Sequence, residues 1–64
     1  MSFNKLDSLF DSLQDTINDC QAAVSKFVEG NNSAGTRVRK AMQAVKALAQ
    51  EVRVEVQDQK NSQF

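Results

Sequence analysis

The sequence predicts an all-α protein, a coiled-coil-like antiparallel two-helix hairpin that completes its core by self-association into a helical bundle. Apolar residues recur at alternating steps of three and four in both halves of the chain, which is the heptad spacing of packed helices. The pair Gly30-Asn31 separates the halves, and so short a link forces consecutive helices to run antiparallel. We expect one domain over residues 1–64, with helices over about 4–29 and about 33–57, a turn at 30–32 and a polar tail at 58–64.

The first predicted helix carries an unbroken heptad seam. Its a and d positions are Phe3, Leu6, Phe10, Leu13, Ile17, Cys20, Val24 and Phe27. Three further apolar residues widen the seam into a stripe that is broad enough for more than one neighbour, namely Leu9, Ala23 and Val28. Ser2 or Asn4 can cap the start of this helix by accepting a hydrogen bond from a free backbone N–H.

The turn and the second helix follow the same logic. Gly30 suits the left-handed position that closes a helix, and Asn31 or Asn32 can cap the next one. In an antiparallel hairpin Phe27 faces Gly35, which either makes room for the ring or is simply tolerated near the helix start. The alternation in residues 52–56 is also a strand signal, but a lone strand is unstable, so we interpret the segment as helical. The second seam is Val38, Met42, Val45, Ala49, Val52 and Val56, flanked on one side by Ala34, Ala41 and Leu48.

A hairpin of this length needs help to be stable. A chain of 64 residues buries only about 60% of its unfolded surface, and such chains usually rely on disulfides, a metal or self-association. Cys20 is the only cysteine and His is absent, so we expect neither a disulfide nor a metal site. We therefore expect a homo-oligomer with a self-association core of Phe10, Leu13, Ile17, Val24, Phe27, Val38, Met42, Val45 and Val52.

Charge is separated between the two halves although the net charge is zero. Residues 1–29 hold five Asp/Glu against two Lys, a net of −3, and residues 30–64 hold six Lys/Arg against three Asp/Glu, a net of +3. A basic stripe beside a heptad seam usually pairs with acids on a neighbouring helix, here Arg53 with Asp7. The alternative is a face that contacts nucleic-acid phosphates. The candidate DNA-binding residues are then Arg37, Arg39, Lys40, Lys46 and Arg53.

The residues support no other chemistry. Without His there is no general base that titrates near neutral pH, and Cys20 on the seam is expected to be a buried, inert thiol. No Gly-rich phosphate loop, signal peptide or membrane-spanning apolar run is visible. We therefore expect a cytoplasmic protein that is not an enzyme and has no cofactor, metal, small-molecule substrate or membrane partner.

The segment around the turn resembles a known family. The run Glu29 to Ala41, EGNNSAGTRVRKA, is similar to the bacterial linker-histone-like nucleoproteins related to the chlamydial developmental DNA-condensing histone. In that family a helix ends at a Gly-Asn turn, and the next helix opens with small residues, a polar residue such as Thr, and Arg-x-Arg, often followed by Lys. The matching positions here are Gly30, Asn31, Ala34, Gly35, Thr36, Arg37, Arg39 and Lys40, and the heptad pattern continues the likeness to about Arg53.

The resemblance implies a small histone-like protein of the nucleoid that binds double-stranded DNA non-specifically through the phosphate backbone. The longer family members carry a Lys- and Ala-rich basic tail, whereas residues 56–64 here are polar and nearly neutral. Two function classes therefore stay open. The first is a DNA-binding architectural protein. The second is a non-enzymatic oligomerisation or adaptor hairpin, in a protein complex or a viral assembly, that binds no DNA.

Overall fold

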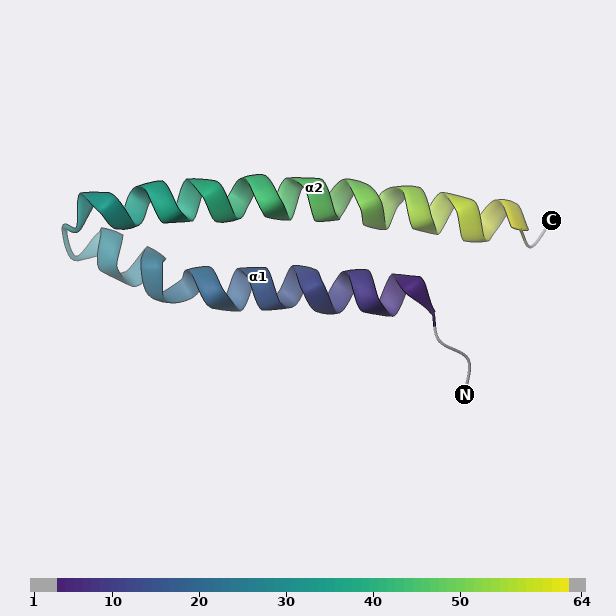
Figure 1. The fold of residues 1–64 in the computed structure, drawn as a ribbon, viewed down its shortest axis with the longest axis horizontal. Helices are drawn as coiled ribbons and strands as arrows, with labels where there is room; N and C mark the ends of the chain where they lie inside the picture. Colours follow the sequence, from purple (N-terminus) through teal and green to yellow (C-terminus); the bar gives the residue numbers. More distant parts are fainter. Residues whose placement is uncertain (1–3, 63–64) are drawn as a thin grey trace.

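In the computed structural model two long antiparallel helices lie side by side (Figure 1), and the structure describes residues 4–62. Helix α1 runs over Lys5–Val28 and helix α2 over Asn32–Ser62. The predicted helical hairpin is confirmed, and residues 52–56 are helical. Ser2 and Phe3, which the sequence offers as a cap and a seam residue, lie outside the described residues, as do Gln63 and Phe64 of the predicted tail.

A Schellman motif ends α1 and leads directly into the cap of α2. The N–H of Asn31 donates to the carbonyl of Lys26 at 3.0 Å, and the N–H of Gly30 donates to the carbonyl of Phe27 at 2.9 Å. Gly30 has a φ of 111°, a left-handed conformation that a residue with a Cβ rarely adopts. The Oδ1 of Asn31 then accepts a hydrogen bond from the N–H of Ala34 at 3.3 Å, which caps α2.

Polar side chains join the helices at the end remote from the turn. The Oδ1 of Asn4 accepts hydrogen bonds from the N–H of Leu6 at 2.9 Å and from Nε2 of Gln59 at 2.7 Å. Helix α2 ends at Ser62, beyond the end predicted near residue 57. The contact with Asn4 anchors this last stretch, and the Oγ of Ser62 donates to the carbonyl of Asp58 at 2.9 Å, which satisfies one carbonyl near the helix end.

The surface between the helices differs from the predicted a/d seam. The less exposed residues of α1 are Leu6, Leu9, Leu13, Thr16, Cys20 and Ala23, which form one stripe of two adjacent rows along the helix. Those of α2 are Ala34, Gly35, Val38, Ala41, Val45, Leu48, Ala49, Val52, Glu55 and Gln59. Placing Leu9, Ala23, Ala34, Ala41 and Leu48 beside the seam is therefore wrong, because they lie in it. The a positions of α1, which were predicted to face α2, point outward instead.

Side-chain size near the turn explains this correction. The buried residues among 4–62 are Cys20 (9% exposed), Ala23 (7%) and Ala34 (1%), and all lie toward the turn. A link as short as Gly30-Asn31 brings the helices close together there, so the row of α1 that ends in small side chains meets α2. Burial of Cys20 agrees with the predicted inert thiol.

One long side of the hairpin is apolar. Two antiparallel helices are related by an approximate two-fold axis perpendicular to their common plane, so equivalent heptad positions of both helices flank the seam on the same side. The positions that directly follow Leu9, Thr16 and Ala23 in α1 therefore share a side with those that follow Ala41, Leu48 and Glu55 in α2. We call this long side the apolar side, and its residues are Phe10, Ile17, Val24, Met42, Ala49 and Val56.

The opposite long side is polar. It carries the residues that flank the seam on its other edge, and we call it the polar side: Lys5, Ser12, Asp19 and Lys26 of α1, and Arg37, Ala44, Glu51 and Asp58 of α2. A shallow depression there brings Lys5 and Leu9 of α1 next to Glu51, Val54 and Asp58 of α2. The two helices thus bury one shared seam and expose two long sides of opposite character.

Candidate nucleic-acid interface

Four cations form a straight row along α2. Arg39, Lys46, Arg53 and Lys60 are seven residues apart, and seven residues return a helix to nearly the same angle, about 10.5 Å further along its axis. All four side chains are exposed. We call them the basic row. Arg39, Lys46 and Arg53 each precede a residue of the apolar side by three positions, so the row borders that side on α2.

The outward face of α2 near the turn gathers four polar side chains. Arg39 and Lys40 line a shallow depression together with Thr36 and Gln43. The first turn of α2 holds no acid, and no acid occurs between Glu29 and Glu51. A guanidinium, an ammonium, a hydroxyl and an amide all offer hydrogen-bond donors to a phosphate oxygen. This depression is therefore a candidate phosphate site.

Arg37 is separated from the other cations near the turn. Residues two apart in a helix lie about 200° apart around its axis, so Arg37 lies on the polar side when Arg39 borders the apolar side. Lys40 lies between them on the outward face. The predicted set of five DNA-binding residues is therefore divided by the fold: Arg39 and Lys40 share the depression, Lys46 and Arg53 extend the basic row, and Arg37 lies apart.

Sequence reasoning missed Gln43 as a member of this site. Charge patterns do not mark a neutral amide. Helical spacing contains the signal, because Gln43 lies three residues after Lys40 and four after Arg39, and such neighbours share a face. Thr36 was named as a position of the family motif and not as a DNA-binding residue, and it lines the same depression.

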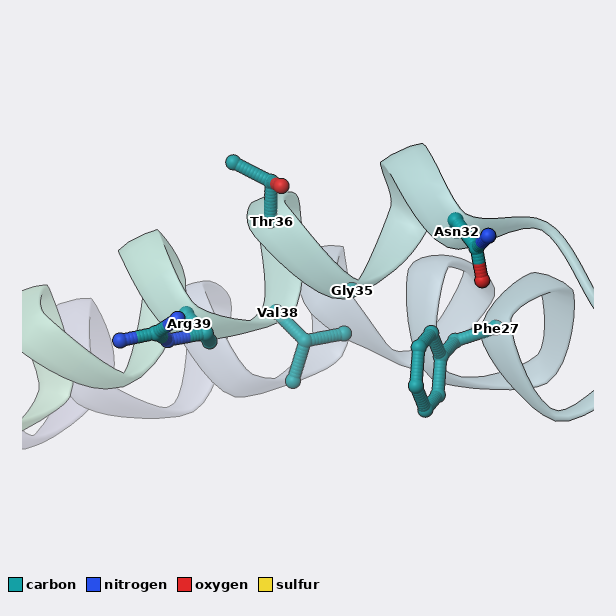
Figure 2. Close-up of a pocket in the computed structure, with 6 residues that line it drawn as sticks. All are labelled: Phe27, Asn32, Gly35, Thr36, Val38 and Arg39. Atoms are coloured by element: carbon teal, nitrogen blue, oxygen red, sulfur yellow. The ribbon is translucent and has the colours of Figure 1, made fainter.

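Close packing against a glycine fixes the turn end of α2. An ideal Cβ placed on Gly35 would lie 2.7 Å from Cε1 of Phe27, which is well inside van der Waals contact. The predicted pairing of Phe27 with Gly35 is confirmed, and room for the ring explains the glycine. Figure 2 shows the Phe27 ring and the Val38 methyl groups on one side of α2 and the Thr36 side chain pointing the other way. Arg39 also lines this second depression, so it lies where the apolar and cationic surfaces meet.

The cations are not engaged in side-chain hydrogen bonds within residues 4–62. The side-chain hydrogen bonds described there involve amides, hydroxyls, one carboxylate and backbone groups, and none comes from a Lys or Arg. The pairing of Arg53 with Asp7, expected from the heptad pattern, is not among them. Each helix exposes its own charge, and the side chains of the basic row are exposed.

The described part of the chain offers no metal centre. In residues 4–62 no three Cys, Asp or Glu side chains come together as a metal ion would require. Neither α1 nor α2, over the residues described, has an apolar stretch that could cross a bilayer.

Comparison with known proteins supplies a family. No curated protein and no solved structure matches the chain. The family model described as histone H1-like protein Hc1 matches residues 7–62, a span that includes most of α1, the whole turn and all of α2. The segment from Glu29 to Ala41, whose resemblance to linker-histone-like proteins the sequence shows, lies inside the match, as do both depressions near the turn. The chain belongs to the Hc1 family of histone H1-like proteins.

Proposed function

We propose that this protein is a small, non-enzymatic, nucleoid-associated protein that binds double-stranded DNA without sequence preference through the phosphate backbone. The observation that carries the proposal is the depression on the outward face of α2, where Arg39 and Lys40 lie exposed beside Thr36 and Gln43. In a chain of the histone H1-like family, a cationic and donor-rich surface is best matched by DNA. A cytoplasmic location at the nucleoid follows from this function.

Arg39 and Lys40 are the main contacts in this proposal. Lys46 lies next along the basic row and extends the contact by about 10.5 Å. A duplex carries one charge per ~1.7 Å of its axis, so phosphates are available at every cation. Arg53 lies further along the same row, and Arg37 contributes only long-range attraction because it lies on the polar side.

Binding should be insensitive to base sequence. Arg and Lys side chains on an outward helix face hold phosphates, whereas base reading in the major groove needs several side chains arranged to reach base edges. Phe27 packs on Gly35 and lines the neighbouring depression, and the proposed contact with DNA does not use its ring to stack on a base. Three phosphate contacts per chain, from Arg39, Lys40 and Lys46, give a slope of roughly −2.7 per chain for log affinity against log salt.

The test compares two double variants in a fluorescence-anisotropy titration with a short duplex at low and moderate salt. R39Q/K40Q removes the depression, and K26Q/R37Q removes the same number of charges from the polar side at the same end of the hairpin. Each variant loses one Arg and one Lys. Gln keeps the helix propensity, and circular dichroism checks that both variants stay helical.

We expect R39Q/K40Q to lose at least about tenfold in affinity and to flatten the salt slope by about 1.8, since each phosphate contact contributes about 0.9. K26Q/R37Q should lose much less. Equal losses in both variants would show that only bulk charge matters and that the depression is not the site. A wild-type protein that does not bind DNA at low salt would leave the assembly or adaptor hairpin as the function.

We infer that the functional unit is a homo-oligomer. No large side chain is fully buried among residues 4–62, and a domain this small with so thin a core is only marginally stable alone. Of the predicted self-association core, Leu13, Val38, Val45 and Val52 face the partner helix and are half-buried within one chain. The other members remain about half exposed, namely Phe10, Ile17, Val24, Phe27 and Met42.

A further inference from the structure

The apolar side is large enough to be a stable interface. Phe10 is 50% exposed, Ile17 46%, Val24 42%, Met42 42% and Val56 39%. The hairpin extends 52 × 22 × 11 Å, so one whole long side, with its polar edges, measures on the order of 1,000 Å², enough for the ~800 Å² per partner of a standard interface. Large apolar side chains that stay about half exposed along such a side mark a site that another molecule covers.

We propose that a second copy of this chain covers the apolar side, with the two-fold axis parallel to the helices and both turns at the same end. The result is a four-helix bundle in which α2 of each copy packs antiparallel against α1 of the other. This inference rests on the proposed self-association and not on DNA binding. It adds to that proposal the side of the hairpin that forms the interface, the relative orientation of the two copies, and the resulting positions of their charged side chains.

Two face-to-face arrangements with two-fold symmetry are available, and charge distinguishes them. With the axis parallel to the helices, α2 of one copy meets α1 of the other. With the axis perpendicular to the helices, α2 meets α2 and the two basic rows face each other along their whole length. Residues 1–29 carry a net charge of −3 and residues 30–64 a net charge of +3. Opposite charges therefore meet in the first arrangement, and like charges meet in the second.

The outer edges of the apolar side carry one matching acid. On α2 the edge is the basic row, and on α1 it is the row of Asp7, Gln14 and Gln21, of which Asp7 is charged. Within one chain Asn4 contacts Gln59 and Phe27 contacts Gly35. These pairs show which residues of α1 lie at the same height along the hairpin as which residues of α2.

These heights predict one ion pair between the copies. In the proposed bundle Arg53 lies at the same height along the bundle axis as the helical turn between Asp7 and Asp11 in α1 of the second copy. This pairing is the one the heptad pattern suggests, but it forms between chains. Rim ion pairs of this kind contribute about 0–1 kcal/mol each, so they select the orientation more than they stabilise the bundle.

The turn end behaves differently. Arg39 and Lys40 lie level with Ala22, Ala23 and Val24 of the second copy, where no acid is present. Their head groups therefore stay available after assembly. Because both turns lie at one end, the bundle places the two depressions near the same pole, on opposite flanks, since the two α2 helices lie diagonally across the bundle.

Distances between spin labels test the orientation directly. In a Cys20→Ala background, Ser33→Cys places a label near the turn and Asn61→Cys places one at the other end. In the proposed bundle both same-site distances are short, about 15–25 Å for helices packed 8–10 Å apart. In the perpendicular arrangement each label pair is separated by a distance close to the 52 Å length of the hairpin. Long distances at both sites would overturn the orientation.

Sedimentation of two matched valine variants tests whether the apolar side forms the interface between the two copies. Val24 on the apolar side is 42% exposed and Val54 on the other edge is 48% exposed. The wild type should sediment at twice 7.1 kDa. Val24→Glu should give monomer or unfolded chain, and Val54→Glu should remain a dimer. A folded wild-type monomer, or a dimeric V24E variant, would overturn the proposal. DNA titration is scored separately, because a dimer with the expected label distances and no DNA affinity would remove only the proposed DNA function.

Discussion

The two long sides of the hairpin flank the same seam, yet they are built for different neighbours. Phe10, Ile17 and Val24 lie at equivalent heptad positions on the apolar side, where the polar side has Ser12, Asp19 and Lys26. Both sets lie one position from the seam, so packing between α1 and α2 does not require the difference. The contrast shows that one chain carries two packing surfaces, of which the hairpin itself uses only the seam.

Truncation of one apolar-side residue should produce the largest change in the free energy of unfolding. It tests whether the two long sides differ in being covered by another molecule. Ile17→Ala should reduce the free energy of unfolding by about 2–5 kcal/mol per chain if a second copy covers the side chain. Within a single chain Ile17 is 46% exposed, and its truncation would then cost much less. Urea unfolding followed by circular dichroism measures the difference, at one fixed protein concentration because folding and assembly are coupled.

Val54→Ala is the matched control for this measurement. Val54 is 48% exposed but lies on the other edge, beside Lys5 and Leu9. We expect its truncation to cost less than about 1 kcal/mol. Equal costs for the two variants would mean that the two sides are energetically alike and that the apolar side is not covered.

Substitution of Gly35, which lies near the turn, should have an intermediate effect on the free energy of unfolding. Gly35→Ala gains about 1 kcal/mol of helix propensity, but its Cβ would lie 2.7 Å from Cε1 of Phe27 and displace the ring. The two terms oppose each other, so the net change in the free energy of unfolding should be near zero or destabilising. In a Phe27→Ala background the same substitution should stabilise by the full amount, about 1 kcal/mol. A double-mutant cycle measured by thermal unfolding gives the coupling, and additive effects would show that the ring and the glycine do not interact.

The smallest effect is expected from acids of α1. Asp11→Asn/Asp15→Asn removes two negative charges, which should reduce repulsion of a duplex held at α2. Both carboxylates are exposed, and exposed charges are screened over ~10 Å at 0.1 M salt. Duplex affinity should therefore rise by less than about fivefold, a change on the order of 1 kcal/mol, and the gain should vanish at moderate salt. An unchanged or lower affinity in the anisotropy titration would contradict the placement of DNA on α2.

Local signals in the sequence predict the architecture well. Gly30-Asn31 defines the turn because a left-handed glycine and an Asn cap are local requirements, and the structure contains both. The heptad spacing predicts two packed helices for the same reason. The end of α2 was predicted too early because it depends on the contact between Asn4 and Gln59, residues that lie far apart in sequence.

The choice of seam could not be predicted from the spacing. Helix α1 has three apolar rows, and periodicity alone does not say which two face α2. The close approach imposed at Ala23 and Ala34 decides it, and this is a property of the folded pair. The candidate site was likewise predicted in part, because the cations are visible in the sequence. Their division into the depression at Arg39 and Lys40, with Arg37 apart, requires the position of α1.

The amide contact between Asn4 and Gln59 also determines how the protein can be attached to other things. It holds the first residue of the described chain beside the last turns of α2, so residues 4 and 62 lie at the same end of the hairpin (Figure 1). Helix α2 has 31 residues, or about 46 Å of length, between this point and the turn. A fluorescent protein, an affinity tag or a natural extension joined at either end would therefore lie at the pole opposite Arg39 and Lys40. In the proposed bundle four such attachments leave from one pole, so DNA bound as proposed at Arg39 and Lys40 would lie at the other end of the assembly.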